Sequence, residues 1–160
     1  MITSIRTMGP ERELLETMLD QVRADLISTV RGLSEADART RLVPSLTTPI
    51  TLIKHAAFAE RMWFQRTLGR LADDDCDGPL WAHGGFEVGD DETMTEVIAE
   101  FERASARARL IAAPIPLDET REHPHTGRVV SLRWIYVFMT AEFARHAGHG
   151  DILREQIEAR

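Results

Sequence analysis

The sequence predicts an all-α protein, a four-helix bundle with long crossover loops. Apolar residues recur at i, i+3/i+4 and i+7 over four long stretches, and signals for β-strands are almost absent. The stretches are about 20 residues long and are joined by connections of about 10–20 residues, which is typical of bundles with crossover loops. A chain of 160 residues fits one domain, so residues 1–160 are expected to form a single bundle domain.

The first long helix is expected from about Pro10 to Gly32, because proline is tolerated at a helix start and glycine favours a helix end. Residues 34–37 have the S-x-x-D spacing of a capping box. They predict a short helix that ends before Pro44.

The second long helix is expected to start at Thr48 and Pro49, an N-cap residue followed by a proline in the first helical position. It continues to about Gly69. Residues 71–90 are rich in acids, glycine and proline, which predicts a loop with one short turn at most, and this loop could form a lid.

Asp90 or Asp91 is expected to cap the third long helix, which ends before Pro114. Residues 115–130 are expected to form a loop with a short extended pair around residues 123–127. Ser131 then caps a fourth helix that runs nearly to the end of the sequence.

The charge balance argues against several partners. Nineteen Lys and Arg residues stand against 26 Asp and Glu residues, for a net charge of −7, so neither nucleic acid nor an anionic membrane is an expected partner. No apolar run reaches the roughly 20 residues that cross a bilayer, and the N-terminus does not resemble a secretion signal. Cys76 is the only cysteine, so a cytoplasmic setting is expected. Its acidic neighbours would raise the pKa of the thiol, which favours an ordinary loop residue over a nucleophile.

The fourth helix carries three side chains suited to binding a metal. Glu142, His146 and His149 are spaced so that they share one helix face, which is otherwise apolar. His55 lies on an apolar face of the second helix and can supply a ligand from the opposite side of a bundle. Two histidines and a carboxylate suit Zn²⁺, Ni²⁺, Mn²⁺ or Fe²⁺, and three protein ligands leave a position open for water or substrate. The alternative is a structural hydrogen bond between His55 and Glu142 across two helices.

Other polar residues give weaker signals. Glu60 and Arg61 are expected on a solvated edge, away from the face that carries His55. His83, His123 and His125 lie in predicted loops and are expected at the surface. Gly148 and Gly150 lie inside the fourth helix and indicate either close backbone packing or a local irregularity there.

Three segments resemble a known family: HAAFAERMWF in the second helix, GDDETMTEVIAEFERA before and in the third, and SLRWIYVFMTAEFARHAGHGDILRE in the fourth. They look like the DinB/YfiT-like superfamily, in its mycothiol S-transferase branch. The resemblance spans nearly the whole chain and is most specific in the fourth helix. It implies a helical bundle, often a homodimer, that holds a divalent metal.

The resemblance also implies a set of ligands. Many relatives carry His-x-x-x-His on the fourth helix, whereas this chain has Glu142 in place of the first histidine. The mycothiol-dependent maleylpyruvate isomerase type shares this departure, and its triad falls on His55, Glu142 and His146. His149 would then be a neighbour of the ligands or an extra ligand.

The implied activity is that of a thiol-dependent S-transferase or isomerase, in which zinc or nickel activates a low-molecular-weight thiol, mycothiol by resemblance, toward a small electrophile. Two other functions stay open at this point. One is a non-catalytic helical module that binds a small ligand or acts in stress. The other, more remote, is a metal-dependent hydrolase that uses a bound water.

Overall fold

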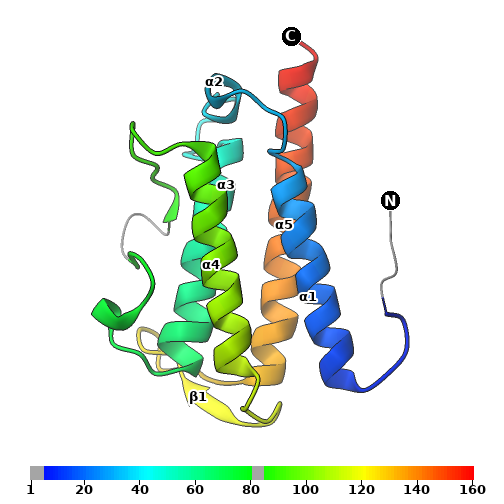
Figure 1. The fold of residues 1–160 in the computed structure, drawn as a ribbon, viewed down its shortest axis with the longest axis vertical. Coiled ribbons are helices and arrows are strands. Elements are labelled where there is room, and N and C mark those ends of the chain that lie inside the picture. The colour runs from blue at the N-terminus through cyan, green and yellow to red at the C-terminus, as the bar shows by residue number, and fades with distance from the viewer. Residues whose placement is uncertain (1–5, 81–84) are drawn as a thin grey trace.

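The computed structural model describes residues 6–80 and 85–160, and it confirms the all-α prediction (Figure 1). Its long elements are four helices that lie side by side. The element bounds are α1 (Glu11–Ser28), α2 (Glu35–Ala38), α3 (Pro49–Glu60), the π-helix η1 (Arg61–Leu68), the 3₁₀ turn η2 (Asp73–Asp75), α4 (Met94–Ala112), β1 (Thr120–Glu122), β2 (Val129–Ser131) and α5 (Leu132–Glu158).

Side-chain caps begin most of these helices. Ser34 accepts a hydrogen bond from the backbone N–H of Asp37, as the S-x-x-D spacing predicted. Thr48 forms a capping box with Thr51, and Pro49 takes the first helical position, so α3 starts where expected.

The start of α4 was predicted two to three residues too early. Its N-cap is Thr93, which forms a capping box with Glu96, rather than Asp90 or Asp91. Both side chains of the Thr93 box satisfy backbone donors, so it is a better cap than a lone aspartate. Ser131 caps α5 as predicted, by accepting from the backbone N–H of Trp134.

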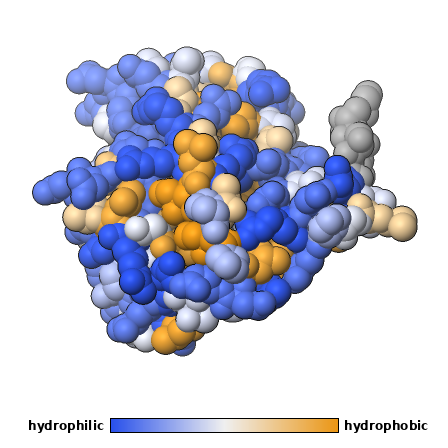
Figure 2. Space-filling view, turned by 60° about the horizontal axis from the view of Figure 1, so that its bottom comes forward, coloured by the Kyte–Doolittle hydropathy of each residue, from blue (hydrophilic) through white to orange (hydrophobic). Residues whose placement is uncertain are grey.

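The expected extended pair before α5 is an antiparallel hairpin. Thr120 pairs with Ser131 and Glu122 pairs with Val129, so β2 leads directly into α5. Gly127 occupies the turn with φ +67°, a conformation that favours glycine. Hydrophobic side chains gather at the centre of the molecular surface at this end, surrounded by hydrophilic ones (Figure 2). No helix among the described residues is long and apolar enough to span a membrane.

The core lies between the four long helices, and α5 passes especially close to the end of α1. Phe101 of α4 packs edge-on against Phe143 of α5, with ring centroids 5.5 Å apart. A Cβ on Gly150 would lie 2.6 Å from Oγ1 of Thr29, so glycine lets α5 approach the end of α1. Of the two explanations for glycine in this helix, close packing is therefore the correct one at Gly150, whereas a Cβ on Gly148 would meet nothing within 4 Å.

Glu60 and Arg61 were predicted on a solvated edge, and this prediction is wrong. Both are buried where α3 passes into η1. Glu60 accepts two hydrogen bonds from Arg23 of α1, at 2.7 and 2.9 Å, and a third from Ser105. The cations that stabilise buried carboxylates come from other helices, so the pattern of one helix cannot reveal them.

Arg61 belongs to a second buried group of charges. It contacts Asp77 at 2.8 Å and Glu100 at 2.6 Å, and Glu100 also lies 2.7 Å from Lys54. A Cβ on Gly78 would be 2.5 Å from the guanidinium carbon of Arg61, so the loop backbone lies directly on this side chain. The network fixes the start of the loop that follows η1.

Candidate metal centre

The three residues predicted as ligands meet between α3 and α5. His55 is in the second turn of α3, and Glu142 and His146 are one turn apart in the middle of α5. The small residues Ala56 and Ala59 are buried beside His55, as expected for a face that approaches another helix closely.

A single carboxylate oxygen links the two histidines. Oε1 of Glu142 lies 3.0 Å from Nε2 of His146 and 3.5 Å from Nε2 of His55. One potential ligand atom from each residue lies within 4.8 Å of the others. The side chains are 11–18 % exposed, so the cluster is close to the surface but largely shielded from water.

Phe86 covers the cluster from the segment that precedes α4. Its ring stacks on His55 with centroids 4.3 Å apart and lies 6.1 Å from the ring of His146. Gly85 makes this possible: it has φ +80°, and a Cβ there would be 2.6 Å from Cβ of Phe58 and 3.0 Å from Cα of His55. Phe86 was not predicted to belong to the site, because a glycine followed by an aromatic residue in a loop is a weak signal.

The charges of the cluster favour an ionised carboxylate. Burial acts to raise the pKa of Glu142, but hydrogen bonds from His146 and His55 outweigh this effect and lower it below its ordinary value. Its other oxygen, Oε2, is 3.2 Å from the exposed guanidinium of Arg145.

The same surroundings favour a neutral imidazole at His146. Burial lowers the pKa of His146, although the hydrogen bond with Glu142 acts in the opposite direction, and the nearby rings of His55 and His149 lower it further. Metal ligands must be deprotonated, so an ionised Glu142 and a neutral His146 are the states that metal binding requires.

Two of the donor-atom distances are close to the ligand spacing of a divalent cation. Two ligands about 2.1 Å from a tetrahedral ion are about 3.4 Å apart, and the two distances from Glu142 Oε1, 3.0 and 3.5 Å, lie on either side of this value. Nδ1 of His146 is buried without a hydrogen-bond partner among the described residues. Its Nε2 therefore carries the polar contacts of this ring and faces Glu142 and His55.

His149 stands outside the cluster. Its side chain is exposed, and its ring centroid is 5.5 Å from that of His146. The three residues that come together in the described part of the chain are therefore His55, Glu142 and His146, without His149.

Some of the other predictions for single residues are confirmed and one is wrong. His125 is exposed as expected, whereas His123 is buried against Trp63, so the surface prediction is wrong for His123. His83 lies outside the described residues. Cys76 follows η2 in a loop, where burial raises the pKa of the thiol and the carboxylates of Asp73 and Asp77 add to the effect, in the direction predicted.

The fold and the cluster define a class: an all-helical protein with a two-histidine, one-carboxylate group that could hold a divalent cation. A comparison with protein families agrees with the resemblance noted in the sequence. The family model described as mycothiol-S-transferase matches residues 14–159, and the chain belongs to this family. No curated protein gives a significant match.

Proposed function

We propose that the protein is a metal-dependent S-transferase that joins a low-molecular-weight thiol, mycothiol, to a small electrophile. The observation that carries the proposal is the convergence of His55, Glu142 and His146 from two helices on one point. The family supports the transferase class and the thiol. Zinc or nickel fits this set of nitrogen and oxygen donors.

The chemistry of the cation would be to hold a coordinating thiol as the thiolate. Glu142 contributes one negative charge and the neutral imidazoles none, so the ligands leave a divalent ion with one positive charge, which suits an anionic sulfur. In the transfer, a sulfur electron pair forms the new S–C bond. The leaving group departs with the electrons of the bond that breaks, and the thiol proton passes to solvent.

Other residues of the chain would prepare the ligands. Phe86 covers His55 and limits the access of water to its ring. Arg145 holds Oε2 of Glu142, which leaves Oε1 directed at the two histidines. Ligand geometry in metal sites depends on such neighbouring contacts.

Metal binding is the first test. Metal-free protein titrated with Zn²⁺ should bind about one ion per chain, and the His55→Ala and Glu142→Ala variants should lose this binding. His149→Ala is the matched control, since it removes a histidine from the same helix face, and it should bind zinc as the unaltered protein does. Wild-type protein that binds neither Zn²⁺ nor Ni²⁺ would contradict the proposal.

Activity is the second test, and it separates the transferase from the other functions. Zinc-loaded protein should consume mycothiol in the presence of 1-chloro-2,4-dinitrobenzene faster than the Glu142→Ala variant. A protein that binds metal but does not accelerate thiol loss with any electrophile of a panel would be a non-catalytic module. Ester hydrolysis without thiol would favour the hydrolase.

A further inference from the structure

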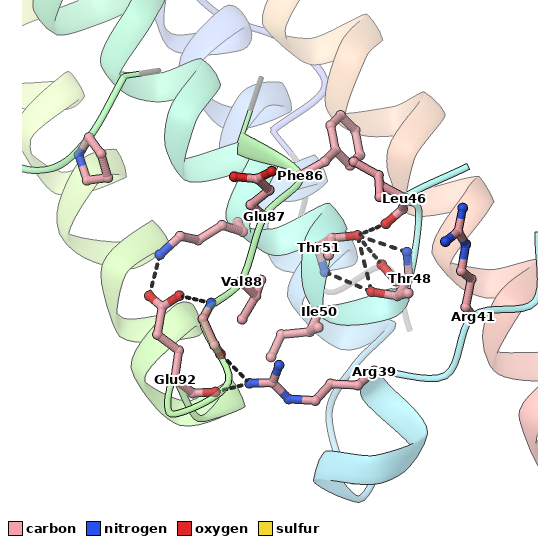
Figure 3. A pocket seen from close by; sticks show the side chains of 13 residues that line it. Arg39, Arg41, Leu46, Thr48, Ile50, Thr51, Phe86, Glu87, Val88 and Glu92 are labelled. Carbon is pink, nitrogen blue, oxygen red and sulfur yellow. Dashed lines mark hydrogen bonds and ion pairs between the residues drawn. The ribbon is translucent and has the colours of Figure 1, made fainter. Parts of the chain in front are cut away.

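Two cavities lie on opposite sides of the segment that connects α2 to α3, residues 39–48. The larger, here called the charged cavity, has a volume of about 700 Å³ and opens between this segment, the start of α3, Pro79 and residues 86–92 (Figure 3). The smaller, here called the apolar cavity, has a volume of about 330 Å³ and lies between residues 43–47 and the end of α5. Both volumes are in the range of small-molecule sites, about 300–1,000 Å³.

The charged cavity combines hydrogen-bonding and apolar groups. Arg39 and Arg41 contribute donors and Glu87 an acceptor, whereas Lys54 and Glu92 pair with each other and apolar side chains such as Phe86 and Val88 form much of the remaining wall. Arg39 and Arg41 direct their guanidinium groups at backbone carbonyls, of Gly89 and Glu92 in one case and of Val43 and Pro44 in the other. The guanidinium N–H groups that are not used in these bonds suit the hydroxyl and amide groups of a hydrophilic molecule, which would otherwise lose their bonds to water.

The charged cavity lies next to the candidate metal centre on the α3 side. Phe86 lines it and stacks on His55. Thr51, which also lines it, is four residues before His55 and therefore shares a face of α3 with it. Phe86 therefore stands between a ligand in this cavity and the two histidines.

The apolar cavity differs in chemistry. Among the described residues, no carboxylate, lysine or arginine lines it. Its walls combine aliphatic side chains with a few uncharged polar groups and one imidazole: Val43, Ser45, Thr47, His149, Ile152, Leu153 and Gln156. A mostly apolar wall with a few polar groups is typical of a site for an uncharged organic molecule.

The apolar cavity lies next to the same centre on the α5 side. His149 lines it, and the ring of His149 contacts that of His146 with centroids 5.5 Å apart. Ile152 and Val43 remain well exposed beside it, so a bound molecule would remove apolar surface from water. The cluster of His55, Glu142 and His146 therefore has a different cavity next to each of its helices.

We propose that each of the two cavities binds one of the two substrates: the charged cavity binds the body of the thiol, and the apolar cavity binds an uncharged, largely apolar electrophile. This inference rests on the proposed function and adds the class of electrophile. The sulfur reaches the centre past His55, and the electrophilic carbon reaches it past His149. With 1-chloro-2,4-dinitrobenzene, an S–C bond forms at the ring, chloride leaves with the C–Cl electron pair, and the thiol proton passes to solvent.

Three tryptophan substitutions at partly exposed aliphatic residues provide a matched test. Leu46, 47 % exposed, lines the charged cavity, and Ile152, 56 % exposed, lines the apolar cavity. Val137, 55 % exposed on the same helix as Ile152, lines neither cavity and is about 22 Å away along the helix axis.

Steady-state kinetics with both substrates varied should separate the variants. Ile152→Trp should raise the KM of the electrophile about tenfold or more and leave the KM of the thiol unchanged. Leu46→Trp should raise the KM of the thiol by a similar factor and leave the KM of the electrophile unchanged. Val137→Trp should change neither. The proposal is overturned if Ile152→Trp leaves the electrophile KM unaltered or if it raises the thiol KM instead.

A binding experiment keeps this test independent of activity. 1,3-Dinitrobenzene lacks the leaving group, so it can bind without reacting. Added to metal-free protein, it should shift the backbone amide NMR signals of residues 43–47 and 149–156, and Ile152→Trp should abolish these shifts. If the shifts occur but thiol is not consumed, the proposed function fails while the apolar cavity stands. If thiol is consumed without these shifts, the division of substrates fails alone.

Discussion

Two polar clusters lie on different sides of the continuous helix formed by α3 and η1, and they differ in how their charges are compensated. In the cluster of Glu60 and Arg23, a fully buried carboxylate receives two hydrogen bonds from a buried guanidinium. In the cluster of His55, Glu142 and His146, the carboxylate meets two imidazoles, and its cationic partner is the exposed Arg145.

This difference separates a structural cluster from one suited to a ligand. The Glu60 pair satisfies its charges within the protein, so a further ion would gain little there. The Glu142 cluster combines an ionised carboxylate with ring nitrogens at ligand spacing, and solvent screens the charge of Arg145. A divalent cation would supply the charge that this cluster lacks.

The largest effect on folding is expected at the structural cluster. Glu60→Ala leaves the Arg23 guanidinium buried without its main partner, which should lower the free energy of unfolding by about 3–5 kcal/mol. Urea denaturation measures this loss. Glu158→Ala, which removes an exposed partner of Arg154, is the control and should cost less than about 1 kcal/mol. A loss below about 1 kcal/mol for Glu60→Ala would show that the pair is not structural.

Zinc should distinguish the two clusters next. An ion that binds only the folded protein at 100 times its Kd stabilises it by about 2.7 kcal/mol, so Zn²⁺ should raise the Tm of the wild type. The increase should vanish in His55→Ala, whose ligand set is incomplete. It should persist in Glu158→Ala, which leaves the candidate centre intact. An equal increase in His55→Ala would place the zinc elsewhere.

Gly85 tests how the covering loop supports the candidate centre. Gly85→Ala places a Cβ at φ +80° and within 3.0 Å of the α3 backbone, so it should destabilise the fold by about 1–3 kcal/mol. It should also displace Phe86 from His55. Gly148→Ala is the control: that helical site is open, and alanine should stabilise the protein by about 0.5–1 kcal/mol. Thermal unfolding of both variants should show opposite signs.

The smallest effect is a pH dependence at His146. Burial lowers its pKa in the folded state, so the unfolded chain binds the proton more readily. The resulting stability is present above the ordinary histidine pKa of about 6.5 and is lost as the pH falls from there through the lowered folded value. His146→Gln should therefore reduce the loss of stability of metal-free protein below pH 6.5.

His123 provides a second test of how stability depends on pH. Burial also lowers the pKa of His123, and the neighbouring His125 adds to this effect. His123→Gln should remove a separate part of the pH dependence. If neither variant changes the slope, the pKa values of both groups are unshifted.

Local signals in the sequence were sufficient for most of the fold. Thr48 with Pro49 and Ser131 mark the starts of α3 and α5 because capping depends on residues three positions apart. The start of α4 was misplaced because the acids at 90–91 were preferred over Thr93 and Glu96, which form the complete capping box.

The candidate centre was predictable for a related reason, and its surroundings were not. Glu142 and His146 are neighbours on one helix, and His55 lay on an apolar face, so periodicity together with the family resemblance was enough to bring them together. Phe86 and the partners of Glu60 come from segments distant in the sequence. No spacing rule connects Glu60 with Arg23, which lies 37 residues away on another helix.

The surroundings of Cys76 affect how readily its thiol would be alkylated. If the protein binds an electrophile as proposed, its own thiol could be alkylated. Burial and nearby carboxylates raise the pKa of Cys76 above its ordinary value, so a smaller fraction of this thiol is ionised near neutral pH than in a free cysteine. The thiolate is the reactive form of cysteine, so the chain's one cysteine should resist alkylation by the electrophile of the proposed reaction.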